Sequence, residues 1–206
     1  MHRTTLSLLL VALAVSCTKS TTTTSPEPPV DSSTAAPDPN PDPNPDETPA
    51  DPVEAPAGAQ ATAQLQSPGG VTGALVLRET AAGLEVDGTI TGLTPGAHGF
   101  HVHEVGECTA PKFESAGPHF DPTKAPHAGP TSAAHHLGDL GNIEADAAGR
   151  AQVHAVVPDL SLTAGDGGSV VGRAMVVHAK ADDLQTQPSG ASGDRIACGV
   201  ITAAAT

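Results

Sequence analysis

Two histidines separated by a single residue, His101 and His103, lie in the run His98–Glu104 and are the first residues that could perform chemistry. If this run is a β-strand, successive side chains alternate between its faces, so the two imidazoles point the same way. Two imidazoles side by side on a rigid strand supply half of a metal site. The alternative is a polar strand face that carries two solvated histidines.

A long, turn-rich connection follows that strand and contains more potential metal ligands. Such a connection has little reason to exist in a compact domain unless something besides a hydrophobic core orders it. Zinc accepts imidazole nitrogen and carboxylate oxygen in a fully occupied four-coordinate site. The four residues that predict such a site are His119, His127, His136 and Asp139. On spacing alone, His135 could take the place of His136.

Five motifs together resemble the copper–zinc superoxide dismutases, most closely their bacterial secreted branch. They are Gly99–Glu104, Gly117–Phe120, His136–Asn142, Gly172–His178 with Lys180–Asp183, and Arg195–Gly199, within residues 60–206. The resemblance implies a copper set of His101, His103, His119 and His178. It also implies that His119 is shared with the zinc set, which is His119, His127, His136 and Asp139.

The activity that this resemblance implies is dismutation of superoxide to oxygen and hydrogen peroxide by copper redox cycling. Zinc would order the loop and tune the bridging histidine, His119, which would carry protons. Arg195 matches the arginine that attracts superoxide, and Asp182 matches an aspartate that hydrogen-bonds one histidine of each metal set, here His101 and His127. A surface salt bridge is the alternative role for Arg195. Asp183 is expected to be solvated, and His98 to be a structural residue.

Two other functions compete with this one. A zinc hydrolase would need a His-Glu-x-x-His helix, and the segment from His103 to Glu107 lacks the second histidine. A non-catalytic copper and zinc storage or delivery lipoprotein would use the same ligands without turnover. Arg195 discriminates against storage, because a storage protein has no use for a cation that guides substrate.

The amino-terminal 60 residues predict export and anchoring. Residues 1–16 have a basic start followed by the apolar run Leu6–Val15, which is too short to span a bilayer but has the length of a secretory signal. Small residues before Cys17 indicate a lipoprotein signal, with Cys17 as the lipidated first residue of the mature protein. The alternative is a plain signal peptide and an unrelated cysteine. Residues 17–60 are rich in Pro, Asp and Thr, which predicts a disordered tether.

The three cysteines of the chain are an odd number for an exported protein, so one is expected to have a separate fate. If Cys17 carries the lipid, Cys108 and Cys198 remain to pair in an oxidising compartment. The resemblance agrees, since the family ties its first metal loop to the last strand by one disulfide. We therefore expect an extracytoplasmic protein anchored to the cell membrane, periplasmic or at the cell surface, that protects the cell envelope from superoxide.

Residues 61–206 are expected to form one all-β domain, since their apolar runs are short and separated by glycine and proline. The expected strands are 61–67, 72–80, 84–93, 98–104, 151–157, 169–179 and 195–202, with a weaker one at 141–145, and Pro68–Gly70 is expected to form a hairpin turn. The resemblance specifies an eight-stranded antiparallel Greek-key barrel, or sandwich, with two long functional loops.

The charge of the chain limits its partners. The formal net charge is −14, and residues 61–206 contain fifteen acidic against seven basic side chains. Such a balance repels polyanions, which argues against a nucleic-acid partner. The expected partners are superoxide and, through Cys17, a membrane. A homodimer is left open, because branches of the family associate through different surfaces.

Overall fold

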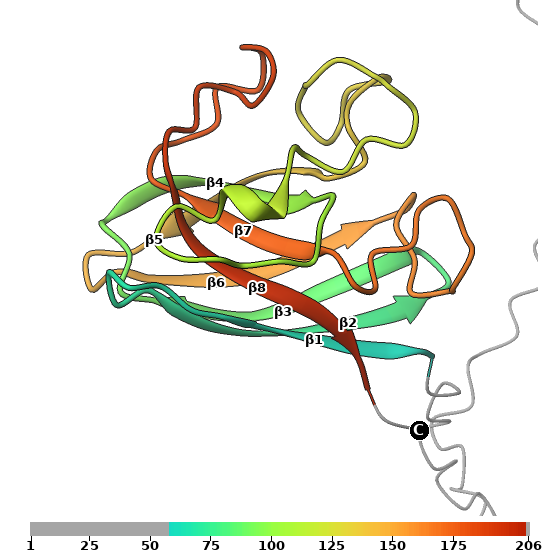
Figure 1. The fold of residues 1–206 in the computed structure, drawn as a ribbon, viewed down its shortest axis with the longest axis horizontal. Helices are drawn as coiled ribbons and strands as arrows, with labels where there is room; N and C mark the ends of the chain where they lie inside the picture. Colours follow the sequence, from blue (N-terminus) through green and yellow to red (C-terminus); the bar gives the residue numbers. More distant parts are fainter. Residues whose placement is uncertain (1–57, 205–206) are drawn as a thin grey trace, which may run out of the picture. The chain divides into compact units, whose positions relative to one another are not determined.

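Eight antiparallel strands close into a barrel in the computed structural model, which describes residues 58–204 (Figure 1). The strands are β1 (Gln60–Leu65), β2 (Thr72–Thr80), β3 (Gly83–Thr91), β4 (Gly96–His103), β5 (Asp139–Ala145), β6 (Arg150–Val157), β7 (Ala174–His178) and β8 (Arg195–Ala203), with one short 3₁₀ helix, η1 (Glu114–Ala116). The all-β, eight-stranded fold class is confirmed.

The order of strands around the barrel is β1-β2-β3-β6-β5-β4-β7-β8, and β1 pairs with β8 to close it. The pairs β3–β6 and β4–β7 join strands that are not consecutive in the chain, which gives the connections of a Greek key. This order places β4 between β5 and β7, so the strand that carries His101 and His103 has a neighbour on each side.

Alternating apolar residues build the interior of the barrel. In β2 the side chains of Leu75 and Leu77 are buried, and in β3 those of Leu84 and Val86 are buried, while the residues between them are partly exposed. This two-residue period is the pattern of a strand with one face on a core. Branched aliphatic side chains dominate the core, and Phe100 is the largest fully buried one.

Most predicted strands agree with the observed ones, and the predicted strand 169–179 is the clearest difference. In the structure β7 begins only at Ala174, because the chain turns just before it. The N–H of Arg173 donates to the carbonyl of Val170 at 3.0 Å, and the N–H of Gly172 donates to the carbonyl of Ile201 at 2.8 Å. The predicted turn at Pro68–Gly70 is present, with the N–H of Gly70 donating to Ser67 at 3.2 Å.

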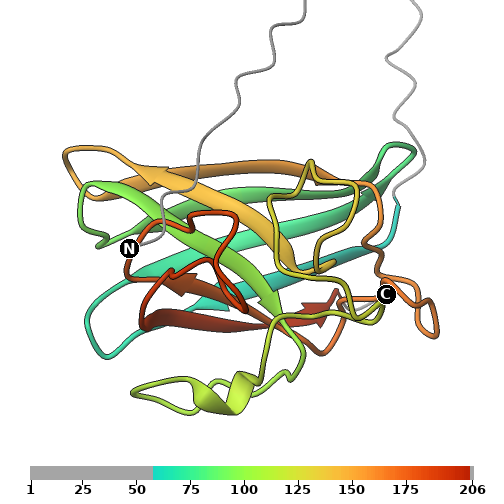
Figure 2. The same ribbon diagram turned by 90° about the horizontal axis from the view of Figure 1, so that it is seen from above.

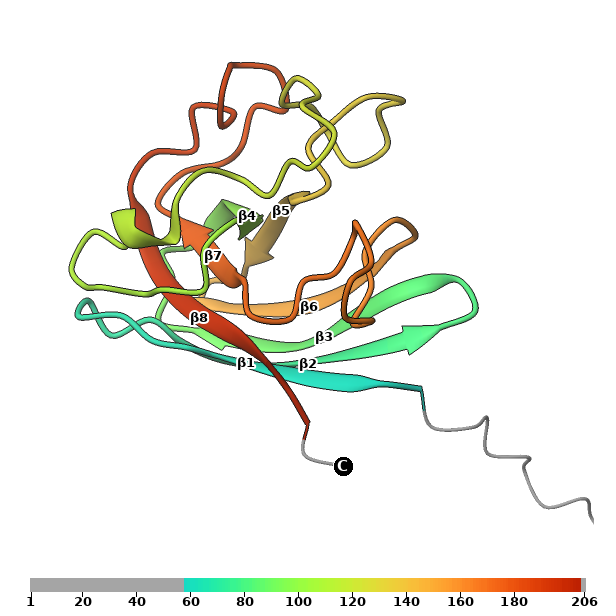
Figure 3. The same ribbon diagram turned by 45° about the vertical axis from the view of Figure 1, so that its right-hand side comes forward.

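Two long loops rise from the same side of the barrel, over β4 and β7. They are residues 104–138, between β4 and β5, and residues 179–194, between β7 and β8. Seen from above in Figure 2, the second loop and the part of the first loop after η1 lie over the barrel, and the part around η1 lies at its side. Figure 3 shows that part beside β8. A disulfide between Cys108 and Cys198 ties the first loop to β8, as predicted.

The predicted signal peptide, residues 1–16, lies outside the described residues, as do Cys17 and nearly all of the predicted tether, residues 17–60. Within the part of the chain that the structure describes, no helix has the length and apolar character that a membrane span would need.

Candidate metal centre

Both faces of β4 are buried, but they are buried against different surroundings. Phe100 and Val102 belong to the core cluster inside the barrel. His101 and His103 alternate with them and are 0% and 1% exposed, so they lie under the two long loops instead of in solvent. The sequence alternation therefore gives β4 one apolar face and one histidine face, as expected.

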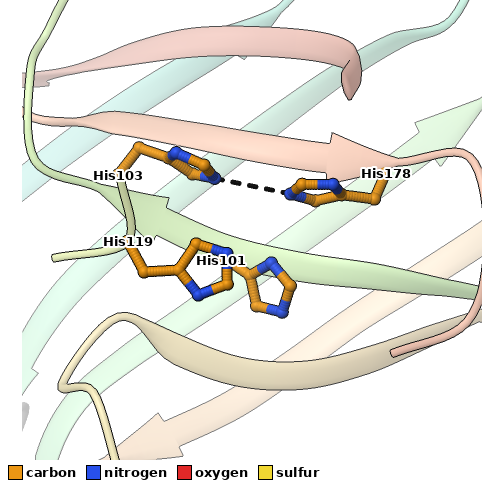
Figure 4. A group of neighbouring side chains, drawn as sticks. All are labelled: His101, His103, His119 and His178. Atoms are coloured by element: carbon orange, nitrogen blue, oxygen red, sulfur yellow. Dashed lines mark hydrogen bonds between the residues drawn. The ribbon is translucent and has the colours of Figure 1, made fainter. Parts of the chain in front are cut away.

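Four histidines come together on the outer face of β4. They are His101 and His103 from β4, His119 from the first loop, and His178 from the end of β7, and all four are buried. One ring nitrogen of each lies within 4.8 Å of those of the others. Figure 4 shows the rings of His103 and His178 facing one another, with Nε2 atoms 3.4 Å apart, and the rings of His101 and His119 beside them. We call these residues the four-histidine set.

A second group, the His₃Asp set, consists of His119, His127, His136 and Asp139. The Nδ1 atoms of the three histidines surround a single oxygen, Oδ1 of Asp139. Their distances to that oxygen are 2.7 Å from His119, 3.0 Å from His127 and 3.2 Å from His136. The contact from His127 is not aligned as a hydrogen bond, and this buried nitrogen has no partner in the structure. Three nitrogens and one oxygen converging in this way match the donors that zinc prefers.

The ring of His119 belongs to both sets. Its Nδ1 contacts Asp139, whereas its buried Nε2 has no hydrogen-bond partner. The Nδ1 of His101, in the same four-histidine set, is buried without a partner too. Buried nitrogens of this kind are costly unless something satisfies them. The unpaired nitrogens fit metal ions in both sets, with His119 between them.

Asp182 connects the two sets from behind. Its Oδ2 accepts a hydrogen bond from Nε2 of His101 at 2.8 Å, and its Oδ1 accepts one from Nε2 of His127 at 3.0 Å. Each ring thus has its Nε2 occupied and its Nδ1 free for a metal. The fit is close, since a Cβ at Gly190, where φ is +64°, would overlap Oδ1 of Asp182.

The four-histidine set faces a cavity of about 640 Å³ that Arg195 also lines, together with His103, His119 and His178. Two hydrogen bonds fix the Arg195 guanidinium: Nη1 donates to the carbonyl of Phe113 and Nη2 to that of Gly117, each at 2.6 Å. The Gly117 carbonyl also accepts Nδ1–H of His103 at 2.8 Å. The cation is therefore held at the mouth of the histidine cluster and makes no salt bridge with a carboxylate of the described residues.

Residues 71–201 match the family model described as copper/zinc superoxide dismutase (SODC). The chain belongs to the copper/zinc superoxide dismutase family. It is 40% identical over 156 residues to the extracellular superoxide dismutase [Cu-Zn] of Onchocerca volvulus, covering 70% of this chain and 76% of that protein. It is also 41% identical over 148 residues to superoxide dismutase [Cu-Zn] 2 of Mesembryanthemum crystallinum, covering 68% of this chain and 93% of that one.

The family binds copper and zinc, and the two residue sets fit these ions. Imidazole nitrogens suit copper, and three imidazoles with a carboxylate suit zinc. The resemblance inferred from the sequence motifs is confirmed at the level of the family. The closer likeness to the bacterial secreted branch stays a prediction.

Burial affects the protonation of the histidines in both sets. It lowers the pKa of His119 to about 4 and that of His178 to about 3, and it lowers the pKa of His103 well below its usual value. The neighbouring histidines lower these values further. Burial also lowers the pKa of His127, but the hydrogen bond to Asp182 and the negative charges of Asp139 and Asp182 outweigh it, so the net shift is upward. Neutral imidazoles are the form that binds a metal.

Burial alone would raise the pKa of both carboxylates, but their hydrogen bonds outweigh it. For Asp139 the bond and charge of His119 dominate, and the pKa falls to about 2. For Asp182 the donors are His101, the N–H of Leu184 and His127, and they hold the pKa well below its ordinary value. Both carboxylates are therefore anionic at neutral pH.

These shifts predict that the metal-free protein loses stability as the pH falls from 6.5 to 4. Unfolded histidines bind protons below pH 6.5, whereas His119 and His178 in the folded chain stay neutral until pH is near 4 or 3. The unfolded state therefore binds more protons in this window, and the free energy of unfolding should fall by on the order of 3 kcal/mol for each ring. His127, whose pKa is raised, opposes the trend, but the pKa values of three other rings are lowered. These are His103, His119 and His178.

Urea unfolding of metal-free protein at several pH values between 7 and 4 measures this effect. Arg150→Gln serves as the control, because Arg150 is exposed on β6 and is not a histidine, so its replacement should leave the slope with pH unchanged. A free energy of unfolding that stays constant over this range would contradict the prediction.

The predicted metal ligands lie in the two sets, and Asp182 and Arg195 lie against them. Cys108 and Cys198 form the disulfide, and Cys17 lies outside the described residues.

His135 is half-buried, with its ring on the Ser132 carbonyl at 2.9 Å, while His136 contacts Asp139. His98 is buried, and its Nδ1–H donates to the carbonyl of His178 at 2.7 Å, a structural contact as expected.

Asp183 behaves differently from the expectation of the sequence analysis. Asp183 is not merely solvated, because Oδ1 accepts the N–H groups of Gln185 at 3.0 Å and Thr186 at 2.8 Å and so orders the second loop. His154 has a partner across the sheet, Asp87, at 2.7 Å. Glu85 also lies near this pair, but Asp87 forms an ion pair with Arg78. We therefore interpret the group as surface ion pairs and not as a metal site.

Sequence analysis missed Asn142 and Gln187, two amide side chains that hold the site from outside. Asn142 exchanges two hydrogen bonds with the main chain of Asp182, and Gln187 exchanges two with the main chain of His127. Asn142 was inside a matched motif but had no role assigned to it. Nothing in the sequence around Gln187 marks it.

Proposed function

We propose that this chain catalyses superoxide dismutation with copper in the four-histidine set and zinc in the His₃Asp set. Membership of the copper/zinc superoxide dismutase family makes it an oxidoreductase that forms oxygen and hydrogen peroxide from superoxide. The observation that carries the assignment of residues is the ring of His119, which belongs to both sets at once.

Copper held by these histidines would supply reversible one-electron chemistry, by which one superoxide is oxidised to oxygen and a second is reduced and protonated to hydrogen peroxide. His119 is the residue that moves a proton. Its Nδ1 is held on the zinc side by Asp139, so Nε2, the buried ring nitrogen without a partner, is the atom that accepts and returns the proton. Burial lowers the pKa of this ring, which favours its release of the proton.

Zinc would keep the His119 ring in place and order residues 119–139. The loop has few apolar anchors of its own, and three of its side chains converge on Asp139. Asp182 supports both metals, since it orients one histidine of each set.

Arg195 supplies the positive charge that superoxide needs in an acidic protein. Its guanidinium lines the cavity beside His103 and His119, and its two hydrogen-bond partners are neutral carbonyls. A fixed cation at a concave site raises the encounter rate of a small anion. The function as a storage lipoprotein is not favoured, because such a protein gains nothing from this cation.

The decisive experiment measures superoxide consumption by the protein loaded with one copper and one zinc per chain, using pulse radiolysis or stopped flow. Catalytic consumption that disappears in His119→Ala supports the proposal. Tight binding of both metals without turnover would instead support storage or delivery.

Arg195→Gln is expected to lower kcat/KM for superoxide about tenfold while both metals stay bound, because the local positive charge is lost. Arg195→Lys should recover part of the rate, since it keeps the charge but not the two-pronged geometry. The dependence of kcat/KM on ionic strength should become weaker in Arg195→Gln. Arg150→Gln removes an exposed arginine on β6 and is the matched control. Equal losses in Arg195→Gln and Arg150→Gln would show that only net charge matters.

The location that we propose is outside the cytoplasm, where the enzyme protects the cell envelope from superoxide. The disulfide supports this location, because such bonds persist in oxidising compartments. Relatives from Onchocerca volvulus and Brugia pahangi are named extracellular. We further propose that residues 1–16 are a signal, that Cys17 carries a lipid anchor and that residues 17–60 tether the domain to a membrane.

Mass spectrometry of the mature amino terminus tests the anchor, since a diacylglyceryl mass on Cys17 would support it and a cleaved, unmodified terminus would refute it. Sedimentation of the same preparation tests self-association, because a homodimer would sediment as a single species of twice the chain mass.

A further inference from the structure

His127 is held at both its ring and its main chain by one short segment, Asp182–Gln187. Asp182 accepts the hydrogen bond from the ring. On the main chain, the N–H of His127 donates to Oε1 of Gln187 at 2.9 Å, and Nε2 of Gln187 donates to the carbonyl of His127 at 2.8 Å. The amide side chain of Gln187 thus satisfies both backbone groups of His127, as a neighbouring strand would.

We propose that Gln187 is a positioning residue of the zinc site, whose amide fixes the main chain of His127 and thereby aims its ring at Asp139 and Asp182. This inference rests on the proposed zinc ligands. It extends them to Gln187, a residue of the other long loop whose side chain contacts the main chain of His127 but no metal-binding atom of either set.

The segment that presents Gln187 is itself ordered. Oδ1 of Asp183 accepts the N–H groups of Gln185 and Thr186, which fixes the turn that precedes Gln187. Nε2 of Gln187 also donates to the carbonyl of Gln185 at 3.2 Å, which sets the direction of its amide. Nearby, the side chain of Leu184 lies against Gly129, two residues after His127. A preordered amide loses little entropy when it pairs with His127.

Asn142, in the middle of β5, makes the corresponding contacts on the other side of the His127–Asp182 bond. Its Nδ2 donates to the carbonyl of Asp182 at 2.9 Å, and its Oδ1 accepts the N–H of Asp182 at 2.7 Å. The two amides fix residues that belong to different parts of the site. Asn142 fixes Asp182, which contacts both metal sets, whereas Gln187 fixes only His127, which belongs to the His₃Asp set alone.

This difference predicts an effect of Gln187 that is confined to zinc. Gln187→Met keeps the length and volume of the side chain but removes both hydrogen bonds to His127 and the one to Gln185. Zinc transfer from the copper- and zinc-loaded protein to an excess of a chromogenic chelator should become about tenfold faster in Gln187→Met. The Cu(II) EPR spectrum, recorded on the fully loaded protein before zinc leaves, should be unchanged.

Two variants complete the test. Gln185→Met makes the same substitution two residues away, where the side chain makes no hydrogen bond within residues 58–204, and it should release zinc at the wild-type rate. Asn142→Leu should speed zinc release and also alter the Cu(II) EPR spectrum, because Asp182 loses its support on the side of His101. The midpoint of thermal unfolding of each metal-free variant reports whether the domain is folded.

If Gln187→Met released zinc as slowly as wild type and Gln185→Met do, the inference would be overturned. The proposed assignment of the zinc ligands would not be affected by that result. A general loosening of the loop would also overturn it, and would appear as equal changes in the copper spectrum of Gln187→Met and Asn142→Leu. If His127→Ala bound as much zinc as the wild-type chain, the proposed zinc set would fail, and this inference with it.

Discussion

Asp182→Asn is expected to weaken the binding of copper and zinc together, by about 10- to 100-fold for each metal. The carboxylate accepts N–H groups from His101 and His127 at the same time, one on each oxygen. An asparagine has the same shape but only one acceptor oxygen, and its amide would face the N–H of the other histidine. One ring is then left with an unsatisfied, buried N–H group and turns away from its metal.

Competition titration with chelators of known affinity measures this loss separately for the two metals. Asp159→Asn is a suitable control, because Asp159 is exposed and its side chain makes no hydrogen bond among the described residues. If Asp182→Asn lost only one metal, the carboxylate would be a support for a single site and not the connection between two. Unchanged affinities for both metals would show that the two rings need no carboxylate behind them.

The membership of the two metal sets could be predicted from the sequence because their members carry strong signals. His101 and His103 sit two apart on a strand, so their common face follows from the period of two. The group from His119 to Asp139 consists of metal-binding residue types in a connection that has no other reason to be long. Their joint resemblance to one family then added His178 and Asp182, which lie far away in the sequence.

The contacts that hold these ligands could not be predicted in the same way. Whether His135 or His136 enters the site depends on the turn that brings His136 to Asp139. The two histidines are adjacent, so their sequence distances to the other ligands are nearly the same and do not distinguish them. Gln187 is a polar residue in a loop, where no period indicates the direction of a side chain. Its partner, His127, is 60 residues away, and the pairing exists only after both loops have folded over β4.

The closure of the barrel shows the same limit at the level of the fold. Alternating residues such as Leu75 and Leu77 identify strands, but they do not say which strands become neighbours. The resemblance implied a Greek-key barrel, whereas the particular neighbours, β3 beside β6 and β1 beside β8, are given by the structure. The length of β7 was wrong in the prediction, because hydrogen bonds to Val170 and Ile201 bend the chain before Ala174.

Removing the disulfide by the double substitution Cys108→Ser and Cys198→Ser is expected to produce the largest loss of stability. The bond joins residues that are 90 apart in the sequence. Closing a loop of this length restricts the unfolded chain by about 4–5 kcal/mol in the chain-entropy model. A domain with three phenylalanines and no tryptophan or tyrosine has few large side chains to compensate for that loss.

The same bond also bears on catalysis, through Phe113. Cys108 and Cys198 pack in a small cluster with Phe113, and the carbonyl of Phe113 is one of the two acceptors that hold the Arg195 guanidinium. Without the disulfide this part of the loop is tied to β8 only by packing, so Arg195 loses a fixed partner. The double variant should therefore show a lower kcat/KM for superoxide than wild type even when both metals are bound.

Urea unfolding of the metal-free double variant at pH 7 measures the loss of stability, and wild-type protein treated with a reductant should show the same loss. Stopped-flow measurement of superoxide consumption by the metal-loaded variant, compared with Arg195→Gln, separates the two effects. If Arg195 depends on the disulfide, adding Arg195→Gln to the double variant should lower the rate by less than it does in wild type. A stability loss below about 1 kcal/mol, or independent effects of the two changes on the rate, would mean that packing around Phe113 alone holds this loop.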